Sequence, residues 1–253
     1  MIVLKSQDEI KRMAEACRIV AEALEEIKKM IAPGITTMEI DKFAESFIIS
    51  RGAVPAFKGY RGYPAALCTS VNEQVVHGIP SMTRLRQGDI VSLDLGVYYR
   101  GFYGDTAATF PVGEVSNTAK KLIAVTAEAL NAGIESAVIG NHVFDISSAV
   151  QKYVEENRFS VVRNFVGHGI GRELHEEPQI PNFVPNSREG MGVVIMEGMT
   201  LAIEPMVNAG TWEVSILDDG WTAVTKDGSL SAHFEHTVAV TKNGPNILTK
   251  LDL

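Results

Sequence analysis

The sequence predicts a mixed α/β fold made of two related halves. Two helical patterns followed by strand-like runs occur in the first part of the chain and again in the second, which indicates an internal duplication. The run His77-Gly78-Ile79 has a counterpart at residues 168–170, at the matching place in the second part. No linker rich in serine or proline separates the parts near residues 111–117. We therefore expect one domain over residues 1–253, with halves at about 6–112 and 113–247.

The first two helices are predicted by capping boxes followed by apolar residues at helical spacing. Helical periodicity then returns twice in the second part. The expected helices run from Ser6 to the stop signal at Pro33-Gly34, from Thr36 to about Gly52, from about Thr118 to Val138, and from about Phe144 to Glu155.

Runs rich in β-branched, aromatic and other apolar residues predict the strands. Arg100-Gly101 separates two of them and is typical of a hairpin turn. Further turns are expected at Asp219-Gly220, Asp227-Gly228 and Asn243-Gly244. The expected strands are Leu67–Val71, Ile90–Tyr99, Phe102–Phe110, Ser160–Val166, Met199–Val207, Trp221–Thr225 and Ala232–Thr241.

The composition is that of an ordinary globular chain, with 45 % hydrophobic and 21 % charged residues. A formal charge of −8 argues against a broad phosphate-binding surface, so we expect no direct readout of nucleic acid. No apolar run approaches the ~18 residues of a membrane span. The apolar stretch at the start of the sequence is too short for the hydrophobic region of a secretory signal peptide. Only Cys17 and Cys68 occur, which favours the reducing cytoplasm.

Two acidic residues stand inside apolar strands, at matching places in the two halves. Asp94 follows Gly88 by six residues, and Glu204 follows Gly198 by six. A carboxylate in such a strand is costly to bury unless it meets a cation. Taken singly, each acid is also compatible with a structural role at a strand end, but the matched spacing in both halves favours a shared site.

Asp105 and Glu235 lie on neighbouring strands of the two halves, so the duplication brings four carboxylates toward one axis. Four converging carboxylates cannot all stay ionised without compensation. Two divalent ions would balance their charge, and His168 adds a nitrogen ligand that favours a transition metal over Ca²⁺. Paired ions of this kind activate water for amide hydrolysis. The residues therefore predict a metallohydrolase. For Asp105, which follows a glycine, a purely structural role in a loop is the alternative.

Six motifs resemble those of the type I methionine aminopeptidases, and the resemblance extends over nearly the whole chain. The matching segments are residues 75–80, 93–95, 101–106, 167–178, 199–206 and 233–237. The resemblance implies the pita-bread fold, an α/β arrangement of two pseudo-symmetric halves with curved antiparallel sheets flanked by helices. It also implies metal-dependent removal of the N-terminal initiator methionine from nascent proteins and peptides, by attack of a dimetal-activated water on the first peptide bond.

The resemblance assigns metal-binding roles to five residues. It implies that Asp94 chelates one ion, that Asp105 and Glu235 bridge both, and that His168 with Glu204 completes the site of the other ion. Glu204 would also shuttle the proton from the water toward the leaving amine. Members of the family use Co²⁺, Mn²⁺ or Fe²⁺, and this ligand set suits several such ions.

The resemblance also marks a methionine pocket, and an apolar, sulfur-tolerant pocket suits a thioether. Two positions differ from several family members: Leu174 replaces a phenylalanine and Phe57 a cysteine, which bears on the width of the pocket. The residues expected to bind the substrate are Tyr60, Tyr63, Cys68, His77, Leu174, His175 and Trp221.

His77 is the repeat counterpart of His168, yet we expect it to bind no metal, because five ligands and a bridging water already serve two ions. His77 and His175 would then donate hydrogen bonds to the substrate. We expect His175 to reach the scissile carbonyl oxygen and His77 the peptide nitrogen.

Two other functions stay open at this stage. An X-Pro aminopeptidase or prolidase shares the fold and ligands, but such enzymes usually carry a large N-terminal domain, whereas the helices here begin at about residue 6. The segment Tyr60–Tyr63 also favours methionine. A non-catalytic binding module is the third alternative, and the five filled ligand positions speak against it. For the enzyme we expect a substrate that is a peptide or nascent chain with an N-terminal methionine, and action near the ribosome. We expect a monomer that makes no contact with a membrane.

Overall fold

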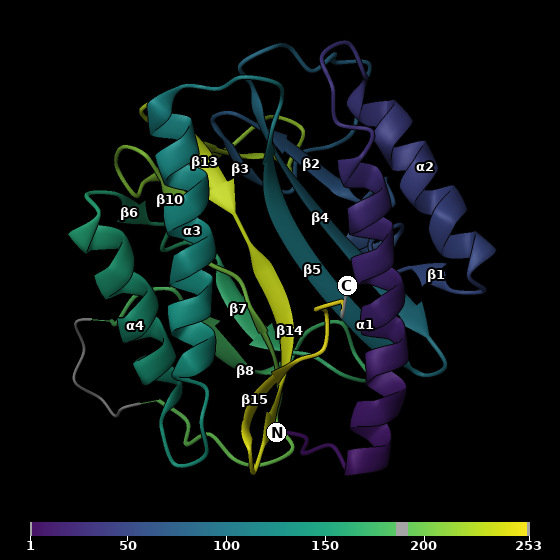
Figure 1. The fold of residues 1–253 in the computed structure, drawn as a ribbon, viewed down its shortest axis with the longest axis vertical. Helices are drawn as coiled ribbons and strands as arrows, with labels where there is room; N and C mark the ends of the chain where they lie inside the picture. Colours follow the sequence, from purple (N-terminus) through teal and green to yellow (C-terminus); the bar gives the residue numbers. More distant parts are fainter. Residues whose placement is uncertain (1, 186–191, 252–253) are drawn as a thin grey trace.

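A nine-stranded antiparallel sheet forms the centre of the computed structural model, which describes residues 2–185 and 192–251 (Figure 1). Its strands follow the order β1-β4-β5-β14-β9-β7-β8, with β2 paired to β4 and β15 paired to β14. Two three-stranded sheets, β13-β10-β6 and β11-β12-β3, complete the β-structure of the described residues. The mixed α/β class expected from the sequence is confirmed.

The helices are α1 (Gln7–Lys28), α2 (Thr37–Ser50), α3 (Asn117–Glu135), α4 (Val143–Glu156) and the 3₁₀ turn η1 (Tyr60–Gly62). The strands are β1 (Val54–Pro55), β2 (Cys68–Val71), β3 (Gln74–Val76), β4 (Ile90–Tyr99), β5 (Phe102–Pro111), β6 (Ser160–Val161), β7 (Val166–Gly169), β8 (Glu176–Pro181), β9 (Thr200–Ile203), β10 (Met206–Asn208), β11 (Val214–Ile216), β12 (Ala223–Thr225), β13 (Ser231–His233), β14 (Glu235–Thr241) and β15 (Gly244–Ile247).

Both predicted capping boxes are present. The Ser6 side chain accepts from the backbone N–H of Glu9, and the Glu9 carboxylate accepts in return from the backbone of Ser6. Thr36 and Glu39 make the same reciprocal pair at the start of α2. Each pair satisfies backbone donors that the first turn leaves without partners, so the helices begin where the sequence predicts.

Three predicted strands are wrong as continuous elements, because each is interrupted. The expected strand at 199–207 divides into β9 and β10 at Glu204-Pro205, where proline has no N–H for the ladder. The expected strand at 232–241 divides into β13 and β14 at Phe234, and the chain changes sheet there. The run at 160–166 ends after Val161 and resumes as β7 at Val166. Strands β1, β3, β8, β11 and β15 were not expected, since they are short or carry polar residues.

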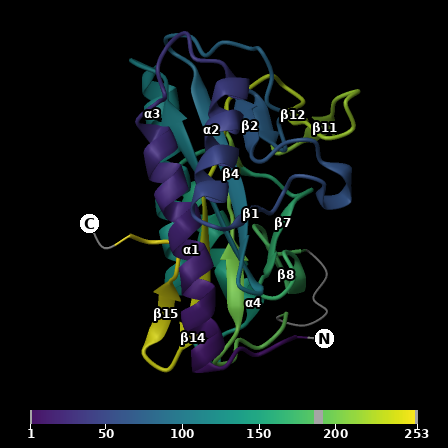
Figure 2. The same ribbon diagram turned by 90° about the vertical axis from the view of Figure 1, so that its right-hand side faces the viewer.

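The hairpin β4-β5, which turns at Arg100-Gly101 as predicted, joins the second half through the pairing of β5 with β14. Helices α1 and α2 lie beside β4 and β5, and α3 and α4 lie beside the strands of the second half (Figure 1). Figure 2 shows α1 and α3 on one side of the central sheet and β7, β8, β11 and β12 toward the other. The helices therefore cover one face of the sheet and leave the other for the site.

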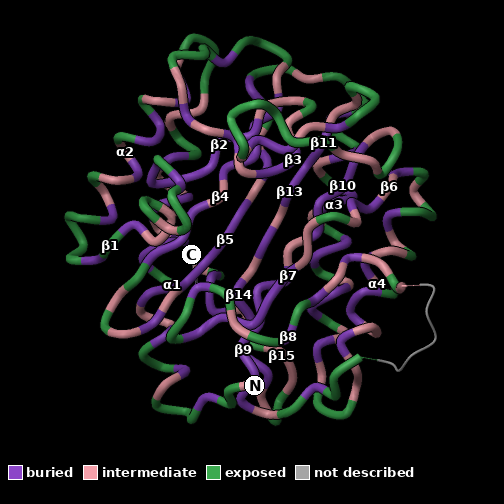
Figure 3. Tube along the Cα trace, turned by 180° about the vertical axis from the view of Figure 1, so that it is seen from behind, coloured by how far each residue is buried: buried purple, intermediate pink, exposed green. Residues whose placement is uncertain are grey.

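Buried residues line the central strands, including β5 and β14 (Figure 3). One apolar cluster packs α1 on the first half, with Met13 and Cys17 against Phe102. A second packs the α3 residues Leu130 and Ile134 against the strands of the second half. None of the helices in the described ranges is long and apolar enough to cross a membrane.

Gly104 of β5 allows α1 to approach the strand next to Asp105. A Cβ at this position would lie 2.7 Å from the backbone nitrogen of Cys17 and 2.9 Å from the carbonyl carbon of Ala16. Because both atoms belong to helix backbone, the clash is not relieved by a change of rotamer. Gly104→Ala should therefore lower the free energy of unfolding by about 1–3 kcal/mol. The midpoint of urea unfolding measures this, and an unchanged midpoint would show that α1 is not packed as tightly as described.

Candidate functional site

Strand register places three carboxylates on one face of the sheet. Asp94 of β4 and Glu235 of β14 both pair with Ala107 of β5, one from each side. Asp105 lies two residues from Ala107 on the same strand, and side chains two apart share a face. The three carboxyl groups therefore converge across three adjacent strands, two from the first half of the chain and one from the second.

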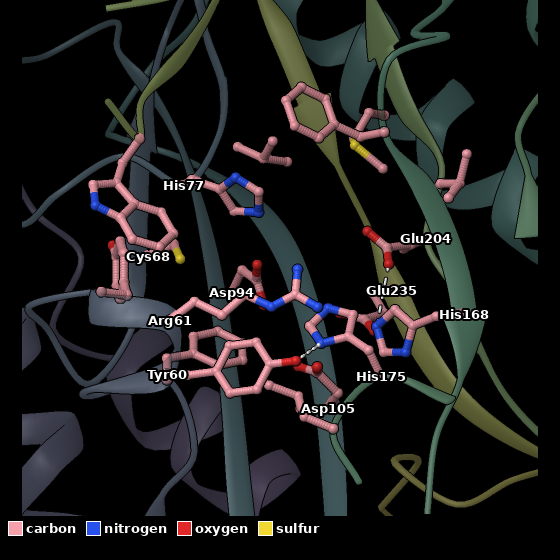
Figure 4. A pocket seen from close by; sticks show the side chains of 18 of the residues that line it. Tyr60, Arg61, Cys68, His77, Asp94, Asp105, His168, His175, Glu204 and Glu235 are labelled. Atoms are coloured by element: carbon pink, nitrogen blue, oxygen red, sulfur yellow. Dashed lines mark hydrogen bonds and ion pairs between the residues drawn. The ribbon is translucent and has the colours of Figure 1, made fainter. Parts of the chain in front are cut away.

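The same rule brings His168 and Glu204 together. His168 of β7 pairs with Ala202 of β9, and Glu204 follows Ala202 by two residues. The Nε2 atom of His168 lies 3.5 Å from Oε1 of Glu204. Ligand atoms of His168, Asp105 and Glu235 all lie within 4.8 Å of one another, and all three residues are buried. Figure 4 shows these side chains in one pocket with Asp94.

Hydrogen bonds from neighbouring side chains hold the backbone of these acids. The Thr237 hydroxyl accepts from the backbone N–H of Asp105 at 3.2 Å and donates to its carbonyl at 2.8 Å. The Thr106 hydroxyl donates to the carbonyl of Glu235 at 2.9 Å. These bonds link β5 to β14 on both sides of the junction, so they fix Asp105 relative to Glu235.

Burial and mutual repulsion make the ionised state of these acids costly. Burial raises the pKa of Asp94 and of Glu204 to about 7. Burial and the neighbouring carboxylates raise the pKa of Asp105 and of Glu235 well above the usual range. Without a cation among them, Asp105 and Glu235 thus favour the protonated form at neutral pH, whereas Asp94 and Glu204 titrate there.

The donor set fits a metal ion. Within the described residues, Oδ1 of Asp94, Oδ1 of Asp105 and Oε1 of Glu235 are buried without a hydrogen-bond partner. Buried polar atoms normally have partners, and a bound cation would supply one to each. Nδ1 of His168 lies 2.9 Å from the carbonyl oxygen of Gly169, which favours a proton on Nδ1 and leaves Nε2 as the free ligand atom.

The same pocket, of about 280 Å³, is also lined by all seven residues expected to bind the substrate. The Tyr63 and Trp221 rings meet edge to face at 5.1 Å between centroids, and Cys68 packs beside them. The Tyr63 hydroxyl donates to the carbonyl of Gly78 at 2.9 Å, so that ring is a fixed wall of the pocket. Leu174 also lines the pocket and is 1 % exposed.

His77 and His175 lie at the same pocket but outside the cluster that contains His168. Burial lowers the pKa of His77 to about 4 and of His175 to about 3, so both rings are neutral at pH 7. Nδ1 of His175 lies 2.8 Å from the Tyr60 hydroxyl, and its ring centroid lies 4.2 Å from that of His168. A neutral imidazole keeps one N–H to donate.

Neither His233 nor Phe165 was assigned a role from the sequence, and Arg61 entered the prediction only as part of the segment Tyr60–Tyr63. Nε2 of His233 lies 3.6 Å from Oε2 of Glu204, so the Glu204 carboxylate is placed between two imidazoles. One signal was available, because His233 stands two residues before Glu235 in a predicted strand and would share its face. Arg61 and Phe165 also line the pocket, and no motif marked Phe165.

Comparison with known proteins gives a consistent family. The model of metallopeptidase family M24 matches residues 11–242. The methionine aminopeptidase of Clostridium perfringens is 55 % identical over 249 residues, covering 98 % of this chain and 99 % of that protein. Methionine aminopeptidase 1 of Bacillus subtilis is 51 % identical, covering 99 % and 100 %.

Solved structures agree with these relatives. The methionine aminopeptidase of Thermotoga maritima has a TM-score of 0.95 and 49 % identity, covering 99 % of this chain and 100 % of that chain. The prolidase of Pyrococcus furiosus has a TM-score of 0.77 and 25 % identity, covering 99 % of this chain and 66 % of that chain. The expected pita-bread fold is confirmed by this likeness.

The stability of the metal-free protein should fall as the pH rises toward 8. The pKa values of Asp94 and Glu204, about 7 when folded, exceed their ordinary values of 3.8 and 4.5, so the folded state binds more protons between those limits. The stabilisation is fully present below about pH 4 and is lost as the pH rises through about 7. Calorimetric Tm values measured in a chelator from about pH 5 to 8 test this. A Tm that rises over that range would contradict it, whereas added Mn²⁺ at about pH 8 should restore the lost stability.

Proposed function

This chain belongs to metallopeptidase family M24, and from that premise we propose that it removes the N-terminal methionine from peptides and nascent proteins. The observation that carries the proposal is a buried cluster of acids and histidine at an apolar pocket lined by Cys68 and aromatic rings. The cluster supplies metal-dependent hydrolysis, and the pocket suits a thioether side chain.

Full-length similarity favours methionine over proline as the specificity. The methionine aminopeptidase relatives match over almost their entire length at up to 55 % identity. The prolidase likeness is 25 % identical and covers 66 % of that protein. The filled ligand positions also speak against a non-catalytic binding module.

A member of this family uses a divalent metal, and we propose two ions of Co²⁺, Mn²⁺ or Fe²⁺. Asp94 would hold one ion, His168 and Glu204 the other, and Asp105 and Glu235 both. When bound, the ions would offset the carboxylate charge and polarise both a water molecule and the scissile carbonyl. Oxygen ligands with one imidazole suit each of these ions.

The side chains of the chain supply proton transfer and orientation. Glu204, whose carboxylate lies between the imidazoles of His168 and His233, would carry a proton from the attacking water to the leaving amine. His175 would donate an N–H to the carbonyl oxygen as negative charge develops, while its Nδ1 faces the Tyr60 hydroxyl. His77 would donate to the peptide nitrogen from the other side of the pocket.

The compartment and the oligomeric state of the active enzyme are the last parts of the proposal. Cys17 and Cys68 are free thiols, which favours action in the cytoplasm, where new N-termini emerge from ribosomes. All the proposed ligands and pocket residues come from one chain, so we expect a monomer to be active.

A peptide assay tests the proposed function. Release of methionine from Met-Ala-type peptides would be measured with and without added Mn²⁺ or Co²⁺, beside an X-Pro substrate. Metal-dependent cleavage of the methionyl peptide alone supports the proposal. Preferred cleavage of the X-Pro substrate would make the chain a prolidase-type enzyme, and no cleavage of either would favour a binding module.

Asp105→Asn should lose at least one metal equivalent and nearly all activity while the fold persists. The substitution removes one of the two carboxylates proposed to bridge the ions and keeps the shape of the side chain. Elemental analysis and turnover measure the effect. The exposed Asp8→Asn serves as the matched control and should behave as the unaltered protein. If Asp105→Asn keeps two tightly bound ions and full turnover, the proposal that Asp105 bridges two metal ions is contradicted.

His77→Ala and His175→Ala should each keep two metal ions and lose about 10²–10³ in kcat. Both side chains are proposed donors rather than ligands, so metal content and activity should separate. His142→Asn is the control, because His142 is the N-cap of α4 and asparagine is a favoured N-cap residue. Loss of metal in step with activity would make the affected histidine a ligand.

A further inference from the structure

Residues 170–175 join β7 to β8 without regular secondary structure, yet the loop 171–175 within them carries two pocket residues. Leu174 forms part of the pocket wall, and His175 stacks on Tyr60 at 5.2 Å between ring centroids. A catalytic hydrogen bond depends on donor position to a fraction of an ångström. Contacts outside the pocket must therefore hold this loop.

The Glu176 carboxylate is the internal anchor of the loop. Its Oε1 accepts from the backbone N–H of Arg172 at 2.8 Å and of Glu173 at 3.2 Å. The Glu176 side chain itself is only 9 % exposed, although its two backbone donors belong to exposed residues. A buried carboxylate of this kind needs a cation nearby.

Lys5, close to the N-terminus, supplies that cation. Its ammonium forms an ion pair with Oε2 of Glu176 and also donates to the carbonyl of Val3 at 3.1 Å. Its side chain is 3 % exposed, and its backbone N–H donates to the carbonyl of Gly198 at 2.7 Å.

Gly171 shows how closely these groups are packed. A Cβ at that position would lie 2.7 Å from the Lys5 ammonium nitrogen and 2.8 Å from Oε1 of Glu176. The backbone of the loop thus lies directly on the ion pair. Removal of the ammonium would leave the Glu176 carboxylate buried and uncompensated beneath the loop.

We propose that Lys5 is a positioning residue that, through Glu176 and the 171–175 loop, holds His175 in place at the substrate pocket. This inference rests on the proposed function, in which His175 donates a hydrogen bond during catalysis. A second ion pair ties the same loop to α1, between Arg172 Nη2 and Oε1 of Glu9 at 3.0 Å. Its arginine is 57 % exposed, so solvent screens it, and it provides a matched control.

Lys5→Met should lower kcat for a Met-Ala-type peptide by about 10²-fold, as expected for a displaced catalytic group. KM should change little, because the affected hydrogen bond strengthens only in the transition state. Metal content should remain at the unaltered value. The control Arg172→Met should stay within about twofold of the unaltered kcat. An unchanged kcat in Lys5→Met, or a loss of metal in step with activity, would overturn the proposal.

A double-mutant cycle tests whether Lys5 acts through His175. In the His175→Ala background, Lys5→Met should cost little further kcat, because the group that it positions is already absent. A full and independent loss of about 10²-fold in that background would contradict the proposal. Lys5→Met combined with Glu176→Gln leaves no uncompensated buried charge and should recover at least part of the lost kcat. The absence of any recovery would also count against it.

Hydrogen exchange gives a readout that does not depend on activity. The Glu173 amide, which donates to Glu176, should exchange faster in Lys5→Met than in Arg172→Met, after correction for intrinsic exchange rates. Equal exchange in the two variants would overturn the proposal. If the unaltered protein does not cleave methionyl peptides, the proposed function fails, whereas the exchange experiment still decides whether Lys5 holds the loop.

Discussion

The burial of four carboxyl groups in one pocket is the constraint on which the rest of this structure depends. Burial raises the pKa values of Asp94, Asp105, Glu204 and Glu235, and neighbouring carboxylates raise those of Asp94, Asp105 and Glu235 further. Such an arrangement persists in a folded protein only when protons or cations offset the charge. The site therefore combines a structural cost with a high potential for binding divalent ions.

The fold meets this constraint by register rather than by flexible loops. Glu235 and Asp94 oppose the same residue of β5, and the Thr237 hydroxyl holds the backbone of Asp105. The groups proposed to contact substrate are placed differently, since His175 is carried by a loop whose anchor is the Lys5–Glu176 ion pair. Rigid strands thus position the proposed metal ligands, and tertiary contacts position a proposed hydrogen-bond donor.

Local sequence signals predicted the helices and the acidic cluster well. Capping boxes at Ser6 and Thr36 act within four residues, and the matched offsets of Asp94 and Glu204 reflect a duplication visible in the chain. The strand breaks at Pro205 and Phe234 were not predicted. A run of strand-forming residues does not indicate where the chain leaves one sheet and enters another. His233 and Lys5 were missed because their partners, Glu204 and Glu176, are remote in sequence or lie across a break.

Titration of the metal-free protein with Mn²⁺ at about pH 7, by calorimetry in two buffers of different ionisation enthalpy, tests the central claim most directly. Carboxyl groups held protonated by burial must release protons when a metal binds. The account predicts two ions per chain and a net release of protons to the buffer. Binding without proton release, or no binding to the unaltered chain, would contradict the claim that these buried carboxyl groups form a site for divalent ions.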